Sequence, residues 1–239
     1  MDQQSAVDNQ TIANSFLVET TGLSRVYRRG KEQIRALDGI NLRIKQGTFT
    51  MLVGPSGGGK STLLHILGGV DHPTSGSVLV NGWALERASE RELTRFRREN
   101  IGFVFQFYNL LPFISAHENV ALPLLAKGQA RSAALREAGR LLEQVGLDGR
   151  KSHNPAELSG GEQQRVAIAR AVAAKPCLVL ADEPTGDLDE ASASAVMVLL
   201  HSLNRSLGTT IVVATHNLQL IQPDDRVIHL AHGRMEEQG

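Results

Sequence analysis

Nine consecutive residues have the types and spacing to hold a phosphate chain. They run Gly54-Pro55-Ser56-Gly57-Gly58-Gly59-Lys60-Ser61-Thr62 and fit the pattern G-x-x-x-x-G-K-[ST]. Glycines let the backbone fold so that successive N–H groups point at phosphate oxygens. The mobile ammonium of Lys60 suits the β- and γ-phosphates, and the hydroxyl of Ser61 is a hard oxygen ligand for Mg²⁺. The sequence therefore predicts a site for a nucleotide phosphate chain.

The surroundings of this loop support the same interpretation. An apolar run, residues 49–53, precedes it, and Leu63, Leu64 and Leu67 follow at helical spacing. A helix that begins near Lys60 would add partial positive charge at its N-terminus. The alternative is a glycine-rich turn that binds nothing, which the order strand, loop, helix disfavours. By itself the motif indicates only a P-loop NTPase, a class that includes kinases, GTPases and many ATPases.

Two acids follow a second apolar run. Residues 178–181 read Leu-Val-Leu-Ala, and Asp182 and Glu183 come next. In a parallel sheet, ligands gather at the carboxyl ends of the strands. We therefore expect Asp182 to hold the Mg²⁺ shell through water and Glu183 to polarise the attacking water. The alternative is a pair of solvated acids before a Pro-Thr-Gly turn.

A second glycine motif, Leu158-Ser159-Gly160-Gly161-Glu162, precedes an apolar helical segment. Ser159 is a natural N-cap, and the N–H groups of Gly160 and Gly161 are suited to a second anion. This motif resembles the signature of ATP-binding-cassette (ABC) ATPases. The resemblance extends from Tyr27 to His216, with all motifs in the family's order.

The resemblance implies a role for further residues. Tyr27 would stack on adenine, Gln106 would touch Mg²⁺ and report occupancy, and His216 would contact the γ-phosphate. Asp189, in the run Gly186-Asp187-Leu188-Asp189, would link two sites. Simpler alternatives remain for three of them: Tyr27 as a core residue, Gln106 as an edge-strand residue and His216 as a polar cap.

The family mechanism gives both glycine motifs a use. Two copies would pair head to tail, so that ATP at Lys60 of one copy is gripped by Ser159 and Gly161 of the other, and hydrolysis would let the halves part. The sequence departs from the family at Gly58, Asp187 and Asn217, and none of these changes removes a catalytic group.

The order of elements predicts a parallel α/β core. Strands are expected at 16–18, 40–44, 49–53, 77–80, 177–181 and 209–215, and helices near 60–67, 131–145, 167–174 and 196–203. The resemblance adds a small antiparallel β subdomain. We expect a loose tail at residues 1–15 and one ABC ATP-binding domain over 16–239, with a helical insert at about 87–158. Arg25, Arg28 and Arg29 are expected to be solvated, and Trp83 and Cys177 to be structural.

Composition excludes several classes. The 239 residues carry 25 Lys and Arg against 25 Asp and Glu, which argues against a protein that coats nucleic acid by bulk charge. The single cysteine, Cys177, permits no internal disulfide and fits a reducing compartment. No stretch approaches the roughly 20 apolar residues that span a bilayer, and the N-terminus lacks a signal core. We therefore expect a cytoplasmic chain that serves a membrane process through a partner.

The segment after Gln106 indicates a branch of the family. Residues 107–113 and 117–125 resemble the branch that powers lipoprotein release and macrolide export. That branch implies a separate permease with a large extracytoplasmic domain, which would hold the chain at the inner face of the membrane. The single cassette in the chain suggests that the pair is a homodimer. The aromatic and apolar residues at 107–113 suit a short coupling helix, unless they pack inside the insert. A soluble ABC ATPase acting on nucleic acid or the ribosome is the alternative function. One cassette, no sustained heptads and no basic excess disfavour it.

Overall fold

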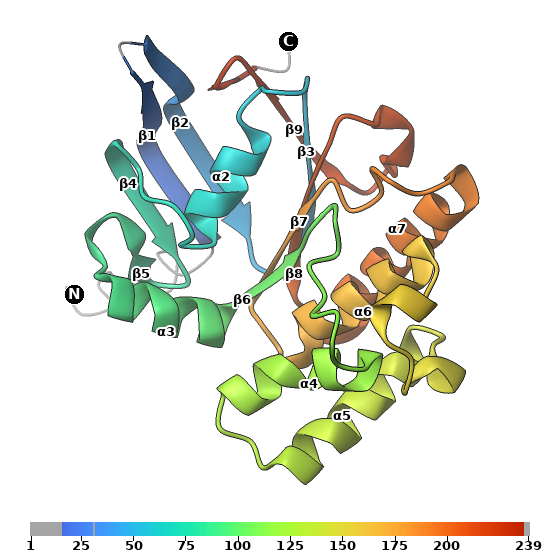
Figure 1. The fold of residues 1–239 in the computed structure, drawn as a ribbon. Helices are drawn as coiled ribbons and strands as arrows, with labels where there is room; N and C mark the ends of the chain where they lie inside the picture. Colours follow the sequence, from blue (N-terminus) through green and yellow to red (C-terminus); the bar gives the residue numbers. More distant parts are fainter. Residues whose placement is uncertain (1–15, 31, 237–239) are drawn as a thin grey trace, which may run out of the picture.

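The computed structural model describes residues 16–30 and 32–236. The tail expected at residues 1–15 lies outside them. The described chain forms two sheets with helices packed between and around them (Figure 1). Among these residues, no helix is both long and apolar enough to cross a bilayer.

The smaller sheet is antiparallel and has the order β2-β1-β4-β5. Its strands are β1 (Phe16–Arg29), β2 (Glu32–Lys45), β4 (Ser75–Val80) and β5 (Trp83–Ala84). In β2, Ile40, Leu42 and Ile44 are buried while their neighbours face outward, which is the predicted alternation. The resemblance's expectation of an antiparallel subdomain is confirmed.

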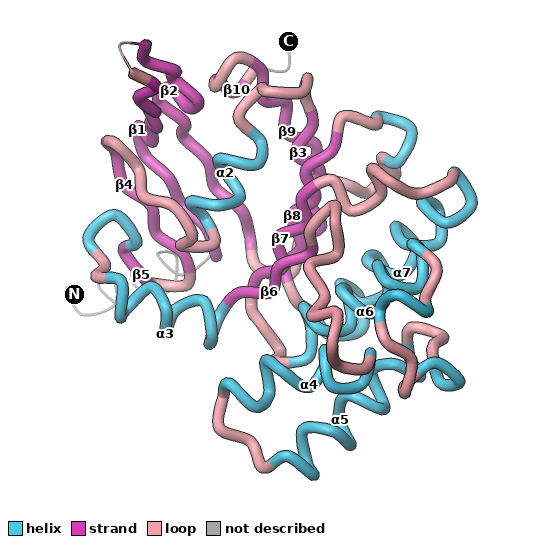
Figure 2. The backbone as a smooth tube through the Cα atoms, viewed as in Figure 1, coloured by secondary structure: helices cyan, strands magenta, loops and turns pink. Residues whose placement is uncertain are grey.

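The larger sheet has the order β10-β9-β3-β8-β7-β6 (Figure 2). It contains β3 (Phe49–Val53), β6 (Ile101–Val104), β7 (Leu178–Asp182), β8 (Thr210–Thr215), β9 (Arg226–Ala231) and β10 (Arg234–Met235). All neighbours pair in parallel except β10 with β9. Both faces of β3 and β8 are buried, which explains their unbroken apolar runs.

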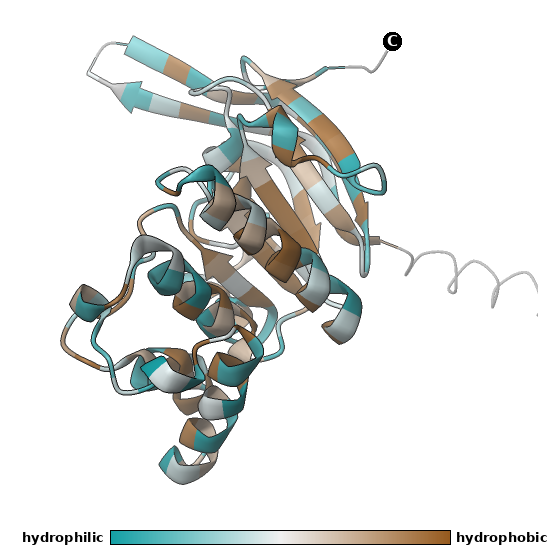
Figure 3. Cartoon of the chain, turned by 90° about the vertical axis from the view of Figure 1, so that its right-hand side faces the viewer, coloured by the Kyte–Doolittle hydropathy of each residue, from teal (hydrophilic) through white to brown (hydrophobic). Residues whose placement is uncertain are grey.

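Helices cover both faces of this larger sheet. On one face lie α2 (Lys60–Leu67), α3 (Glu90–Asn100) and the antiparallel sheet; on the other lie α4 (Ala116–Ala126), α5 (Arg131–Gln144), α6 (Gly160–Ala173) and α7 (Glu190–Leu207). Alternate residues of β3 serve the two cores, because Leu52 packs with α2 while Met51 packs with α6. The apolar strands lie between helices in Figure 3. Short 3-10 turns occupy Leu85–Arg87, Asp148–Arg150, Pro155–Glu157 and Leu218–Leu220.

The segment expected to be a helical insert, residues 87–158, also contains parts of the core. β6 is an edge strand of the larger sheet, and α3 buries Leu93 and Phe96 against the antiparallel subdomain. The charges of mixed sign at 88–100 lie on the outer face of an amphipathic helix, so they do not mark a separate unit. The helical part begins after β6, with α4 and α5.

Candidate nucleotide site

Four of the predicted motifs follow strands at one edge of the larger sheet. The phosphate loop follows β3, Gln106 follows β6, Glu183 follows β7 and His216 follows β8. These strands run parallel, so their carboxyl ends meet at the same edge. The fold therefore brings together side chains that are more than 100 residues apart in sequence.

The phosphate loop is pressed against β9 and needs glycine at its first and last turns. A methyl carbon on Gly54 would lie 1.9 Å from the carbonyl oxygen of Leu230. Gly59 has a φ of 103° at the start of α2, a conformation that L side chains rarely adopt. Gly58 accepts a hydrogen bond from the N–H of Gly233 at 3.0 Å. Residues 55–57 form an exposed tip between these anchors, and Thr62 is half-buried in the first turn of α2.

The ammonium of Lys60 lies inside this loop. Its Nζ donates to the carbonyls of Gly54 at 2.8 Å and Pro55 at 3.1 Å, and the side chain is 6 % exposed. The same Nζ is 3.7 Å from Oε1 of Glu183. A buried cation within a glycine-rich loop at the start of a helix is suited to a phosphate chain.

Ser61 and Asp182 offer oxygens to a hard cation. The Ser61 hydroxyl donates to Oδ1 of Asp182 at 3.0 Å, so the two groups face one point beside the loop. Mg²⁺ takes most of its ligands from water and phosphate and needs few from protein. The residues present therefore fit this ion, although among described residues no cluster of three or more His, Cys, Asp or Glu could hold a metal alone.

Glu183 is held in a left-handed conformation, with a φ of 45°. For a residue with a side chain this costs roughly 1–2 kcal/mol, and such strain concentrates at functional sites. The N–H of Glu183 donates to the carbonyl of Ala214 at 2.9 Å, and Oε1 accepts from Nδ1 of His216 at 2.9 Å. Glu183 thus lies between Lys60 and His216, in position to act on a water at the phosphate.

Gln106 lies in a turn after β6, so it is not an edge-strand residue as the alternative had it. Its Nε2 donates to Oδ1 of Asp187 at 3.3 Å. A methyl carbon on Gly186 would lie 3.1 Å from the amide of Gln106. The glutamine therefore rests against the turn that follows Glu183.

The signature motif begins a helix, as predicted. Ser159 caps α6: its hydroxyl accepts from the N–H of Glu162 at 3.3 Å, while the Glu162 carboxylate accepts from the Ser159 N–H at 2.8 Å. These bonds, with Arg150 nearby, hold the pKa of Glu162 below its usual value. Asp189 caps α7 by its side chain alone, and its bonds to the hydroxyl and N–H of Ser192 lower the pKa of Asp189.

The signature and the phosphate loop of one chain face different regions. α2 packs on one face of the larger sheet and α6 on the other. Among described residues, no hydrogen bond or ion pair joins 54–62 to 158–162. A single copy therefore does not bring the two anion-binding elements together.

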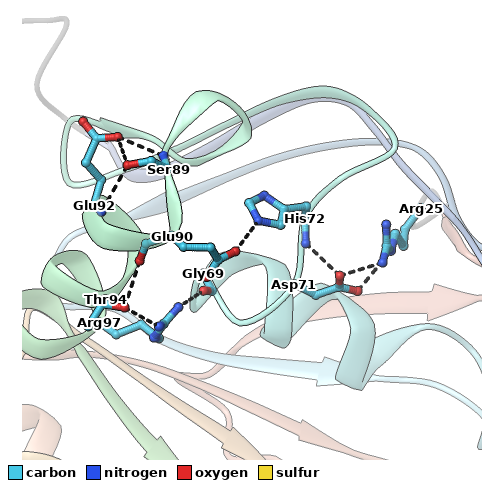
Figure 4. Close-up of polar contacts among 9 residues, drawn as sticks. All are labelled: Arg25, Gly69, Asp71, His72, Ser89, Glu90, Glu92, Thr94 and Arg97. Carbon is cyan, nitrogen blue, oxygen red and sulfur yellow. Dashed lines mark hydrogen bonds and ion pairs between the residues drawn. The ribbon is translucent and has the colours of Figure 1, made fainter.

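Tyr27 is fixed by Asp71, in the segment between α2 and β4. The Tyr27 hydroxyl donates to Oδ2 of Asp71 at 2.6 Å, and the Arg25 guanidinium lies 4.6 Å from the ring centre. Arg25 also binds both Asp71 oxygens, at 3.0 and 2.6 Å, so the expectation that it is solvated is wrong (Figure 4). Arg28 is exposed as expected, and the Arg29 side chain lies outside the described part.

Sequence reasoning missed Gln164, which is fully buried in α6. Its Nε2 donates to the carbonyl of Pro184 at 2.6 Å, directly after Glu183. Gly161, Gln164 and Ile168 are buried at helical spacing. A glutamine at a position that this spacing assigns to the core could therefore have been recognised from the sequence as a residue with a specific polar contact. Arg170 was missed as well, and nothing in the local pattern distinguishes it from a solvated arginine.

This arrangement defines an ABC ATPase. Residues 37–186 match the profile of the family described as "ABC transporter", and the chain belongs to this family. It is the ATP-binding and hydrolysing subunit of an ABC transporter, with hydrolysis coupled to transport.

Particular relatives cover almost the whole chain. The chain is 47% identical over 222 residues to the "Lipoprotein-releasing system ATP-binding protein LolD" of Pseudoalteromonas translucida. The aligned residues cover 93% of this chain and 96% of that relative. The protein of the same name from Geobacter metallireducens is 49% identical over 221 residues, 92% and 98% of the two chains. Among solved structures, the fold is similar to the "Dimeric structure of a post-hydrolysis state of the ATP-binding cassette MJ0796 bound to ADP and Pi", with a TM-score of 0.85, 42% identity and coverage of 92% and 97%.

Proposed function

We propose that two copies of this chain close head to tail around two ATP molecules to drive a permease that releases lipoproteins from a membrane. The observation that carries the dimer is the separation of the two anion-binding elements on opposite faces of one sheet. Each is half of a site, and a second copy supplies the other half. The dimeric form of a relative with 42% identity supports the same arrangement.

Each side chain at the edge of the sheet has a distinct task in hydrolysis. Lys60 and the loop N–H groups hold the β- and γ-phosphates and offset their charge. Glu183 takes a proton from the attacking water, and the Nδ1–H of His216, 2.9 Å from Oε1, orients that carboxylate. Ser61, Asp182 and Gln106 would hold Mg²⁺, which supplies charge neutralisation between the β- and γ-phosphates. Tyr27 offers its ring to adenine, with Asp71 fixing its hydroxyl.

The permease would dock beside Gln106. Phe107, Leu111 and Phe113 are 73%, 50% and 94% exposed, and Asn109 of the same segment lines a groove of about 580 Å³ with residues of α3, β6, α4 and α6. An exposed apolar edge beside a groove suits an amphipathic helix. Leu110 is half-buried and packs against the core, as the alternative of packing inside the insert allows for part of this segment. The names of the relatives above support lipoprotein release as the process, and docking would place the chain at the inner face of the membrane.

Changing Glu183 to Gln tests the dimer. The amide keeps the shape of the side chain and cannot take a proton, so ATP hydrolysis should fall at least about 10²-fold while ATP with Mg²⁺ traps a dimer. Size-exclusion chromatography with light scattering measures the mass. Lys60→Ala in the same background is the control, because it removes the phosphate ligand and should stay monomeric. A Glu183→Gln protein that binds ATP and remains a monomer contradicts the proposal.

A further inference from the structure

The loop that carries Gln106 continues into a strained turn. Tyr108 and Asn109 have φ angles of 58° and 48°, so two successive residues with side chains are left-handed. L side chains rarely adopt this conformation, although asparagine does so more readily than tyrosine. Such a turn persists only where its surroundings hold it.

Arg170 of α6 provides that restraint. Its Nη2 donates to the carbonyl of Tyr108 at 2.8 Å and its Nη1 to the carbonyl of Asn109 at 2.5 Å. The rigid guanidinium fork thus binds the two strained residues, and it pairs with no carboxylate of residues 16–30 and 32–236. The side chain is half-buried, and burial lowers the pKa of Arg170, which stays charged.

The same turn also rests on the start of α6. A methyl carbon on Gly160 would lie 2.8 Å from the hydroxyl oxygen of Tyr108, so this ring sits directly over the signature. Gln164 adds a weaker contact, from Nε2 to the carbonyl of Phe105 at 3.5 Å. α6 therefore contacts the loop at both ends, at Gly160 and at Arg170.

We propose that Arg170 is a positioning residue that keeps the Gln106 loop bound to the signature helix, so that both move as one unit when ATP binds. This rests on the proposed roles of Gln106 and Ser159. Arg170 touches no nucleotide in this account, although it is one of the residues that line the groove at which the permease would dock. Its two hydrogen bonds stabilise the left-handed backbone conformation of Tyr108 and Asn109.

Removing the fork tests this role. In the full chain, Arg170→Met should raise the hydrogen-exchange rate of amides 106–111 at least about tenfold without nucleotide, because the turn loses its two bonds. It should lower kcat for ATP at least about fivefold and leave KM within about twofold, because the phosphate ligands are untouched. Arg136→Met, at an exposed position on α5, is the matched control.

A second substitution separates this role from general loss of stability. Glycine adopts positive φ without steric cost, so Asn109→Gly in the Arg170→Met protein should restore at least half of the lost kcat. If Arg170→Met does not fold, Arg170→Lys replaces it, since an ammonium cannot serve both carbonyls as the fork does. Exchange and kcat equal to those of Arg136→Met overturn the proposal, as does a loss that Asn109→Gly leaves unchanged. The exchange experiment needs no dimer, so its result is separate from the Glu183→Gln test.

Discussion

At the scale of single residues, the catalytic edge combines groups of opposite charge in a small volume. Lys60 has its ammonium 3.7 Å from Glu183, and Glu183 accepts from His216. The types of these residues and their order were predictable, because each follows an apolar run that ends at a loop. The left-handed conformation of Glu183 was not, since it arises from the turn made by Pro184–Gly186 and from the bond to Ala214.

The first loop glycine gives a prediction at this scale. Gly54→Ala would place a methyl carbon 1.9 Å from the Leu230 carbonyl, so β9 or the loop must move. We expect the free energy of unfolding to fall by about 1–3 kcal/mol and ATP affinity to fall as well. Urea denaturation and nucleotide titration measure the two effects. Gly149→Ala is the control, because its methyl group meets open space at an ordinary φ, and equal stability of both variants would refute the close contact.

At the scale of elements, buried strands and capped helices were the most predictable parts. β3, β7 and β8 are recognisable as apolar runs, and α6 begins at Ser159 because its side chain and Glu162 cap each other. The position of α3 was the hardest to predict from the sequence. Its eleven residues carry charges of both signs, and only Leu93, Phe96 and Asn100 are buried, so the sequence shows little of its place against the antiparallel sheet.

The contact between α7 and β3 predicts a dependence of stability on pH. His201 of α7 is buried, stacks on Phe49 at 3.8 Å and lies 3.6 Å from Asp225. Burial lowers the pKa of His201 below 6.5; Asp225 opposes this shift and Arg205 adds to it. As the pH falls through about 6.5, His201 takes up a proton in the unfolded chain but stays neutral in the folded chain. The free energy of unfolding therefore decreases as the pH decreases.

Thermal unfolding between about pH 7.5 and about pH 5.5 measures this loss, and the His201→Phe protein is the comparison. Phenylalanine keeps the stacking on Phe49 and does not titrate, so the variant should lose less stability over this interval. The same decrease in both proteins would show that His201 does not contribute to it.

At the scale of the whole molecule, the central sheet separates the phosphate loop from the signature. Sequence alone identified both elements, but it contained nothing about the faces on which they lie. The side chains that join distant segments, Gln164 to Pro184 and Arg170 to Asn109, were equally hidden, because such contacts depend on tertiary packing.

Mixing two inactive proteins tests whether a site is shared. Ser159→Arg blocks the signature and Lys60→Ala removes the phosphate ligand, so each homodimer should be inactive. In an equal mixture, half of the dimers are mixed and each has one intact site, which gives on the order of a quarter of the wild-type sites. ATP hydrolysis of the mixture measures the rescue. Activity no higher than that of the separate proteins would argue against two chains sharing a nucleotide.

The exposed apolar edge predicts where a membrane partner binds. Leu111 and Phe113 are exposed in the segment whose Asn109 lines the groove, so Asp at both positions should remove apolar contact area and lower permease capture at least about tenfold. Co-purification with a co-expressed permease of the proposed class measures the loss. The control is Val198→Asp, because Val198 is 59% exposed on α7, outside the groove residues. Thermal unfolding of all variants should be similar, since none of these side chains is buried. Equal capture by both variants would indicate that the partner binds another face of the protein. A loss confined to the Leu111 and Phe113 variant would indicate that the coupling helix binds next to the loop that carries Gln106.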